Sequence, residues 1–143
     1  MKIQELMTSK IVAVHQLEPI SHAARLMKRH NLGVLPVCDE QGHLRGILTD
    51  RDIVTRCIAG DMSPDETKVR EIMTRGLHTC SPQDDIHSAL DAMSREQIRR
   101  LPIVDDGKLV GIVSLGDLAR SGMHAMETAE AFTDISANIQ HRE

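Results

Sequence analysis

Residues 46–52 read Gly-Ile-Leu-Thr-Asp-Arg-Asp, and residues 111–117 read Gly-Ile-Val-Ser-Leu-Gly-Asp. Both follow the pattern Gly-h-h-(Thr/Ser)-x-x-Asp, in which h is an apolar residue, and they begin 65 residues apart. In each stretch, residues of strand character lead into a hydroxyl residue and an aspartate, at the spacing of a helix start. Finding this pattern twice indicates an internal repeat, and the repeat decides the fold.

The rest of the chain repeats around these two stretches. At an offset of 66, residues 5–39 align with residues 71–105 and share ten identities, which include the Met-Thr pairs at 7–8 and 73–74. After one deleted residue the offset becomes 65. We therefore divide the chain into a first repeat (residues 1–59), a linker (60–67), a second repeat (68–121) and a C-terminal helical tail (122–143).

The first repeat reads as strand, helix, strand, strand and helix. Residues 11–14 are β-prone, and Pro19 suits the first helical position. Apolar residues then recur at helical spacing as far as Met27. Residues 32–38 and 44–48 form two strands that are joined by a polar turn, and a second helix begins near the aspartate of the motif.

The second repeat has the same order of elements. It has a β-prone run at 77–80, a helix that follows Ser81-Pro82, and strands at 98–104 and 109–113. A unit of about 55 residues buries little surface and is only marginally stable alone. We therefore expect an α/β (α+β) fold in which the two repeats pack sheet to sheet as one pseudo-twofold module.

The composition excludes several classes of protein. The chain has one phenylalanine and no tryptophan or tyrosine, and its formal net charge is −4. Neither aromatic stacking on single-stranded nucleic acid nor a broad phosphate-backbone footprint is therefore expected. Neither an apolar run long enough to span a membrane nor a signal peptide is present in the sequence, so we expect a cytoplasmic protein without membrane contact.

The sequence also lacks the usual catalytic and metal-binding motifs. It contains no Walker loop, no Gly-x-Gly-x-x-Gly and no Gly-x-Ser-x-Gly, and none of its eight histidines forms a His-x-x-x-His or His-Glu-x-x-His pair. The nearest approach to a metal site is Cys38 with His43, and the three cysteines read as reduced, partly buried thiols. We therefore expect neither an enzyme nor a metal site.

The repeated residues resemble the CBS domain pair, also called a Bateman module. The Met-Thr starts, the strands Leu-Pro-(Val/Ile)-x-Asp at 35–39 and 101–105, and the two Gly-to-Asp motifs carry the resemblance, which covers residues 1–121. The chain is similar to small stand-alone bacterial members of that family. The resemblance implies a regulatory module that binds adenosine-containing ligands in clefts between the repeats. The family uses AMP, ADP, ATP, NAD and S-adenosylmethionine.

The motif ends have residues that suit a ribose. Asp52 and Asp117 can accept hydrogen bonds from ribose hydroxyls, while the hydroxyls of Thr49 and Ser114 can meet ribose or phosphate. The helix N-terminus adds free N–H groups that favour an anion. The alternative is that both aspartates simply cap their helices and the hydroxyl residues close the turn.

Phosphate contacts differ between the repeats. The second repeat has Arg99 and Arg100 where the first has Gly33 and Val34, and such basic positions commonly hold phosphate in CBS pairs. The first repeat instead has Arg51 inside its motif. Arginine suits bidentate phosphate contacts, and the alternative is that all three are solvated surface residues.

The base slot is expected between the first strand of each repeat and the strand after its first helix. Ordinary core packing is the alternative for each of these residues. The candidates are Val14, Val34 and Pro36, with Val12 and Ala13, in the first repeat, and Thr79, Cys80 and Pro102, with His78, in the second.

The resulting prediction is a sensor that binds an adenosine-containing small molecule as a regulatory ligand and signals to an unknown protein partner by population shift. The family habit implies a homodimer. The tail has a weak apolar stripe at 125, 129, 132, 136 and 139, which indicates either a helix on its own chain or a dimer helix. The alternative function is a non-catalytic interaction scaffold with degenerate nucleotide sites.

Overall fold

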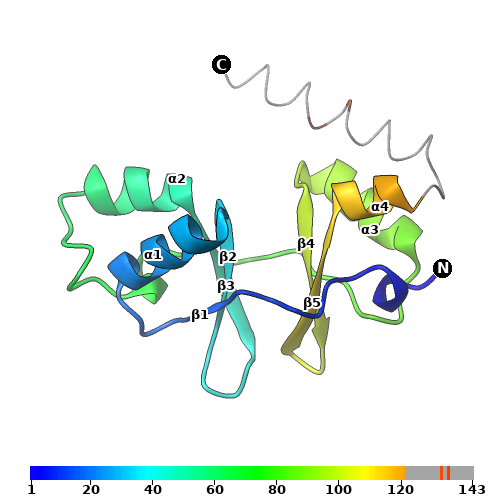
Figure 1. Cartoon of the computed structure of the whole chain (residues 1–143), viewed down its shortest axis with the longest axis horizontal. Helices are drawn as coiled ribbons and strands as arrows, with labels where there is room; N and C mark the ends of the chain where they lie inside the picture. The colour runs from blue at the N-terminus through cyan, green and yellow to red at the C-terminus, as the bar shows by residue number, and fades with distance from the viewer. Residues whose placement is uncertain (122–132, 134, 136–143) are drawn as a thin grey trace. The chain divides into compact units, whose positions relative to one another are not determined.

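The structure is a computed structural model that describes residues 1–121, 133 and 135 (Figure 1). The chain divides into two compact units. Unit 1 comprises residues 1–11, residues 78–106 and the described residues from 110 onward. Unit 2 comprises residues 12–77 and 107–109.

Unit 2 contains a three-stranded sheet in the order β1 (Val14–His15), β2 (Val34–Cys38) and β3 (Leu44–Thr49). β1 runs parallel to β2, and β2 runs antiparallel to β3. Three successive residues in the middle of β2 are buried, so this strand does not alternate between core and solvent. Such a continuous apolar run is typical of a strand that is covered on both faces.

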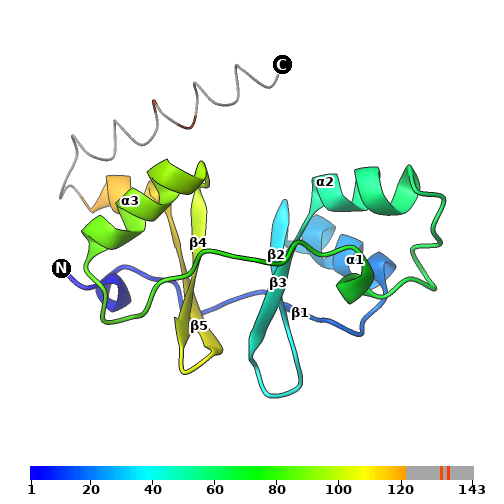
Figure 2. The same ribbon diagram turned by 180° about the vertical axis from the view of Figure 1, so that it is seen from behind.

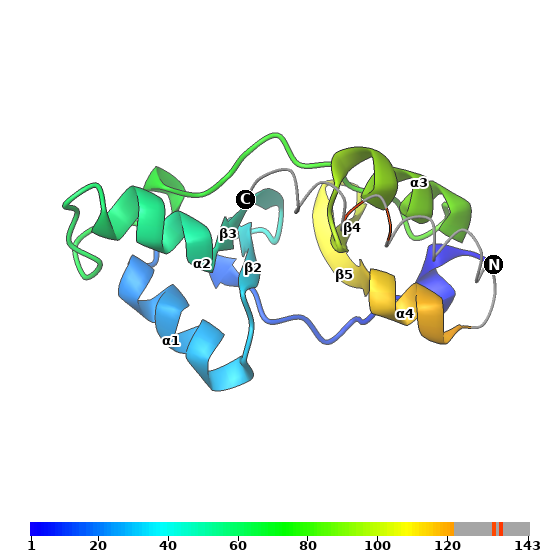
Figure 3. The same ribbon diagram turned by 90° about the horizontal axis from the view of Figure 1, so that it is seen from above.

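Two helices lie on one side of this sheet, as Figure 3 shows. α1 (Ile20–His30) buries Ile20, Ala23 and Met27, which recur at the spacing of one helical face. α2 (Asp50–Asp52) continues without a break into a π-helical turn over Ile53–Ile58. That turn brings Cys57 into the same apolar cluster.

Unit 1 contains a two-stranded sheet of β4 (Arg100–Asp105) and β5 (Lys108–Ser114). α3 (Ile86–Glu96) and α4 (Leu115–Arg120) lie on one side of it (Figure 3). Asp85 is the N-cap of α3, and its side chain accepts a hydrogen bond from the His87 amide at 2.9 Å. This bond lowers the pKa of the Asp85 carboxyl and stabilises the helix start.

The first residues of each repeat pack in the unit that contains most of the other repeat. Near the N-terminus, the 3₁₀ turn Ile3–Glu5 puts Ile3, which is fully buried, into the core of unit 1. The corresponding 3₁₀ turn Val69–Glu71 puts Val69 into the core of unit 2. The segment that continues from this turn crosses unit 2 beside β3, as Figure 2 shows. The two compact units therefore differ from the two sequence repeats, because each takes its N-terminal segment from the other half of the chain.

Three sequence-based expectations were wrong in detail. The strand expected at 11–14 is restricted to Val14–His15, and the run 77–80 forms no strand beyond a single parallel bridge between Cys80 and Ile103. Both runs lie where the chain passes from one unit to the other, so few of their residues lie beside a strand with which they could pair. Pro19 is not the first helical residue but the N-cap, with an extended backbone at ψ 151°.

Other expectations concern the cysteines, the tail and a membrane span. The three cysteines are free, as predicted, with Cys57 and Cys80 buried and Cys38 partly buried. The apolar stripe expected in the tail lies outside the described residues, although Ile135 belongs to the core of unit 1. Among the described residues, no helix is long and apolar enough to cross a bilayer.

Candidate functional site

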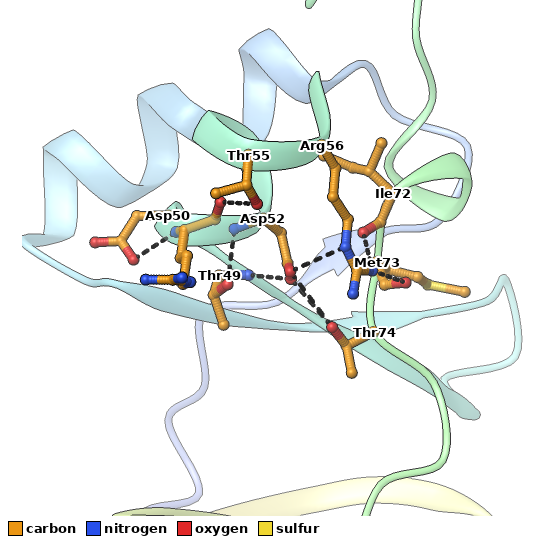
Figure 4. Close-up of polar contacts among 9 residues, drawn as sticks. Thr49, Asp50, Asp52, Thr55, Arg56, Ile72, Met73 and Thr74 are labelled. Carbon is orange, nitrogen blue, oxygen red and sulfur yellow. Dashed lines mark hydrogen bonds and ion pairs between the residues drawn. The ribbon is translucent and has the colours of Figure 1, made fainter. Parts of the chain in front are cut away.

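In unit 2 the candidate site lies at the junction of β3 and α2 (Figure 4). Thr49 is the N-cap of α2, and its Oγ1 accepts a hydrogen bond from the Asp52 amide at 3.0 Å. In return, Asp52 Oδ2 accepts one from the Thr49 amide at 3.0 Å. This reciprocal pair is a capping box, and it explains locally why a hydroxyl residue and an aspartate stand three positions apart.

The Asp52 carboxylate has two further partners, one on the segment that follows the linker and one on the turn that follows α2. The Thr74 hydroxyl lies 3.4 Å from Asp52 Oδ1 and 3.3 Å from Oδ2, and Arg56 Nε lies 3.6 Å from Oδ1. These groups cover Asp52, which is only 7% exposed. The structure therefore shows that Asp52 caps its helix and that its carboxylate is shielded from solvent.

Arg56 also contacts the backbone of that segment. Its Nη1 donates to the carbonyl of Ile72 at 3.0 Å and more weakly to that of Met73 at 3.4 Å. Figure 4 shows Arg56 spanning from the turn that follows α2 to residues 72 and 73. One side chain thus joins the carboxylate of the site to the segment that leads into unit 1.

In unit 1 the equivalent junction of β5 and α4 has the same capping box. Ser114 Oγ accepts from the Asp117 amide at 3.0 Å, and Asp117 Oδ2 accepts from the Ser114 amide at 2.9 Å. The other oxygen, Oδ1, accepts from Arg120 on the same helix at 2.5 Å. The Asp117 side chain is 22% exposed, against 10% for that of Asp52, so the carboxylate of unit 1 is the more open one.

The motif glycines permit close approach of the Met-Thr segments. A Cβ atom on Gly46 would lie 2.6 Å from the Thr74 carbonyl oxygen, and one on Gly111 would lie 2.6 Å from Met7 Sδ. At Gly46 any larger residue would therefore push the segment away from its strand, whereas at Gly111 it would first displace the flexible Met7 side chain. The sequence showed both glycines and both Met-Thr pairs, but not that they meet crosswise.

The charges beside the two junctions differ. Arg99 and Arg100 are exposed at the start of β4, and the Arg99 carbonyl accepts from the Leu115 amide at 2.8 Å. In unit 2 the same backbone contact joins Gly33 to Asp50, and the Asp50 carboxylate is so close that a Cβ on Gly33 would lie 3.3 Å from it. One unit therefore has arginines at this junction, and the other has a carboxylate next to the exposed Arg51.

The residues predicted for the base slot are brought together within each unit. In unit 2, the strand β1 that contains Val14 lies beside β2, which contains Val34 and Pro36. Val14 and Pro36 are buried and Val34 is partly buried, so they contribute to the core as well as to any slot.

In unit 1, the Cys80 amide donates to the Pro102 carbonyl at 3.3 Å, and both residues are buried. Burial raises the pKa of the Cys80 thiol, which therefore stays protonated and presents apolar surface at neutral pH. Thr79 is exposed.

The predicted ligand residues thus form two groups. Thr49, Arg51, Asp52, Val14, Val34 and Pro36 belong to unit 2, while Arg99, Arg100, Ser114, Asp117, Thr79, Cys80 and Pro102 belong to unit 1. Sequence reasoning missed Arg56, Thr74 and Arg120. The repeated Met-Thr pair was the available signal for Thr74.

Comparison with known proteins assigns the family. The sequence model of the CBS domain matches residues 3–58 and 69–124. The chain belongs to the CBS domain family. The two matched segments agree with the tandem repeat read from the sequence, and the fold is that of a CBS domain pair, as predicted.

Other CBS domain proteins are similar along most of their length. CBS domain-containing protein YhcV of Bacillus subtilis is 44% identical over 97% of this chain and 98% of that protein. Hypoxic response protein 1 of Mycobacterium tuberculosis is 32% identical over 82% of each.

Two solved CBS structures are informative. The structure of Hypoxic Response Protein I with two coordinated zinc ions superposes with a TM-score of 0.77 at 32% identity, and covers 84% of this chain and 98% of that one. The CBS domain pair of protein MJ0100, in complex with 5′-methylthioadenosine and S-adenosyl-L-methionine, superposes with a TM-score of 0.72 at 30% identity. The match covers 85% of this chain and 95% of that one. In the described part of the present chain, no three His, Cys, Asp or Glu side chains are grouped to hold a metal ion.

Proposed function

We propose that this CBS pair is a regulatory module that binds an adenosine-containing ligand at the two strand-to-helix junctions. The observation that carries the proposal is the pair of capping boxes, each of which holds an aspartate at a helix start and commits only one carboxylate oxygen, Oδ2, to the cap. The second oxygen of each aspartate, Oδ1, is the acceptor for ribose hydroxyls. The adenosine compounds bound to the CBS pair of MJ0100 support this ligand class.

Each junction supplies further groups of the kind that a nucleotide needs. The exposed guanidinium groups of Arg99 and Arg100 in unit 1, and of Arg51 in unit 2, are the donors for phosphate. The buried residues Cys80 and Pro102 supply apolar surface for the base in unit 1. AMP, ADP, ATP, NAD and S-adenosylmethionine are the ligands to compare, and the chain acts by changing the population of a state that a protein partner or a second copy recognises.

A thermal-shift panel of adenosine, AMP, ATP, NAD and S-adenosylmethionine tests the proposal. A ligand at about 100 times its Kd stabilises a folded protein by about 2.7 kcal/mol, which is easily measured. Calorimetry then compares the wild type with Asp117→Ala. We expect the ligand to bind roughly 10- to 150-fold more weakly at unit 1, because a hydrogen bond to a charged group is lost. Unchanged affinity in the folded variant would remove Asp117 from the site.

A scaffold without a ligand is the second candidate function. Val54 and Ile58 are 59% and 56% exposed on the turn that follows α2, although both are large apolar residues. Apolar side chains on one exposed turn suit contact with another protein. A panel that gives no thermal shift, together with a larger species that Val54→Ser and Ile58→Ser dissociate, would favour the scaffold.

A further inference from the structure

In unit 2 a hydroxyl group of the chain itself, that of Thr74, contacts the carboxylate of Asp52. Thr74 Oγ1 lies within 3.4 Å of both oxygens of Asp52, in the kind of O–H to carboxylate contact that a ribose hydroxyl would make (Figure 4). Both contacts are long for this type of hydrogen bond, which prefers about 2.5–2.7 Å. Because the Asp52 side chain is 10% exposed, another hydroxyl group can reach it only after Thr74 moves.

Arg56 keeps Thr74 in this position. Its guanidinium approaches the Asp52 carboxylate and donates to the carbonyls of Ile72 and Met73, the two residues before Thr74. The Arg56 side chain is 50% exposed, so each contact is individually weak and open to competition from water. Together they join one side of the site to the backbone of the segment.

The segment is also paired with β3 and leads directly out of unit 2. The Thr74 amide donates to the Ile47 carbonyl at 2.8 Å, and the Ile47 amide donates back at 3.0 Å. Only residues 75–77 separate Thr74 from His78, where the chain enters unit 1. A displacement of Thr74 therefore acts on the connection between the units.

The second repeat is built differently at the same positions. Ser121 stands where the first repeat has Arg56, and its hydroxyl donates to the Leu118 carbonyl on its own helix. Asp117 Oδ1 accepts from Arg120, also on its own helix. The carboxylate of unit 1 is thus held within one helix, whereas that of unit 2 is tied to a segment from outside the first repeat.

We propose that Arg56 and Thr74 form a latch that closes the carboxylate of unit 2, and that a ribose hydroxyl displaces Thr74 and so releases residues 72–74. This inference rests on the proposed function, because it assigns a regulatory contact to the same site. It makes unit 2 the site that responds to its ligand by moving the connecting chain. Unit 1, which has no equivalent of Arg56, binds without that response.

The first test needs no ligand. Hydrogen exchange is measured for the amides of Ile47 and Thr74 in the wild type and in Arg56→Met, which keeps the apolar stem but removes the donors. We expect exchange at both amides to be roughly 3- to 10-fold faster in the variant, because the paired segment opens more often. The matched control is Arg120→Met, read at the equivalent amides of Thr8 and Ile112, which donate to the carbonyl of Ile112 at 2.8 Å and of Thr8 at 3.0 Å respectively. No change is expected there, and unchanged exchange at Ile47 and Thr74 in Arg56→Met would overturn the latch.

The second test measures competition. Adenosine is titrated by calorimetry into Thr74→Val and Thr74→Ser, each in an Asp117→Ala background that weakens binding at unit 1. Valine removes the hydroxyl at nearly the same size, so we expect adenosine to bind about 3- to 10-fold more tightly to Thr74→Val than to Thr74→Ser. Equal or weaker binding to Thr74→Val would overturn the latch but leave the proposed function standing. Adenosine that binds neither these variants nor the wild type would overturn both.

Discussion

Asp52 and Asp117 are identical residues in equivalent capping boxes, yet the carboxylate oxygens that the cap does not use face different partners. Asp52 Oδ1 lies near Arg56, four residues later on the same helical run, and near Thr74 from another segment, while Asp117 Oδ1 faces Arg120 three residues later. A carboxylate that is tied to a neighbouring segment can transmit a change at the site. A carboxylate that is tied to its own helix mainly stabilises that helix. The residue alone does not decide between these roles, because its surroundings do.

The arginines of unit 1 should distinguish phosphate from nucleoside. We expect the double variant Arg99→Gln, Arg100→Gln to weaken AMP binding roughly tenfold and adenosine binding much less, because only phosphate contacts are removed. The difference should shrink at high salt, since both side chains are exposed and salt screens them. Calorimetry with AMP and adenosine measures it, and Arg95→Gln, an exposed arginine of α3, is the control. Equal losses for both ligands would mean that the arginines act on the fold or the base slot.

The turn between β2 and β3 contains a carboxyl group, that of Asp39, which should make the stability of the fold fall as the pH is lowered into the acid range. Burial alone would raise the pKa of Asp39, but hydrogen bonds from the His43 amide, Arg45 and the Gln41 amide lower it to about 2. Because the pKa is lower in the folded chain, the ionised carboxyl stabilises the fold above about pH 4, and this contribution disappears as the pH falls toward 2. We therefore expect Asp39→Asn to unfold at lower urea than the wild type at pH 7, and the gap to close near pH 2. In an Arg45→Gln background, the difference in urea midpoint between proteins with and without Asp39→Asn should be smaller, because one of the groups that stabilise the ionised carboxyl is missing. A difference that does not change with pH would contradict the prediction.

The sequence predicted the local part of the site and missed the rest. The spacing of Thr49 with Asp52 and of Ser114 with Asp117 is a local signal, and each pair makes the capping box that was considered as the alternative to ligand binding. Thr74 reaches Asp52 only because residues from outside the first repeat pack in its unit. No pattern of spacing within one repeat contains that information.

At the scale of elements, long periodic segments were predictable and short ones were not. The apolar stripe that ends at Met27 and its counterpart that ends at Met93 gave two helices, which the structure places at Ile20–His30 and Ile86–Glu96. β-propensity at 11–14 and 77–80 did not give strands of that length, because propensity describes a surface fit and pairing partners decide the strand. Both runs precede a helix where the chain is still crossing between units.

The N-terminal 3₁₀ turn should stabilise unit 1 despite its small size. Ile3 is fully buried in the core of that unit, and its amide donates to the Asp84 carbonyl at 2.9 Å. We expect Ile3→Ala to lower the free energy of unfolding by about 2–4 kcal/mol, the usual cost of truncating a large buried residue. Urea denaturation measures the change, and Gln4→Ala, at an exposed neighbour, should cost less than about 0.5 kcal/mol. A loss below about 1 kcal/mol for Ile3→Ala would show that the turn is not part of the core.

For the whole molecule, the length of each repeat predicted that one repeat alone is only marginally stable, and the structure shows how the two halves share their cores. The core of unit 2 includes Val69, Ile72 and Met73, all from the start of the second repeat, while the core of unit 1 includes Ile3 from the start of the first. The division into residues 1–59, 60–67 and 68–121 remains a proposal about the sequence repeat. The compact units cut across it, because packing depends on contacts that no sequence offset shows.

Each unit has core residues from both halves of the chain, so we predict that the two halves stay associated when the covalent link between them is cut. A protease site inserted after Asp65, between two exposed residues, allows the folded protein to be cut into residues 1–65 and 66–143. We expect the cut protein to elute from a sizing column with the uncut one, because each unit keeps buried residues from both fragments. Urea should separate the fragments, and cut protein with Ile3→Ala should come apart at lower urea, since one of the shared contacts is lost. If the fragments separate in buffer at micromolar concentration, the core residues that each half contributes to the other unit add too little binding free energy to hold the halves together.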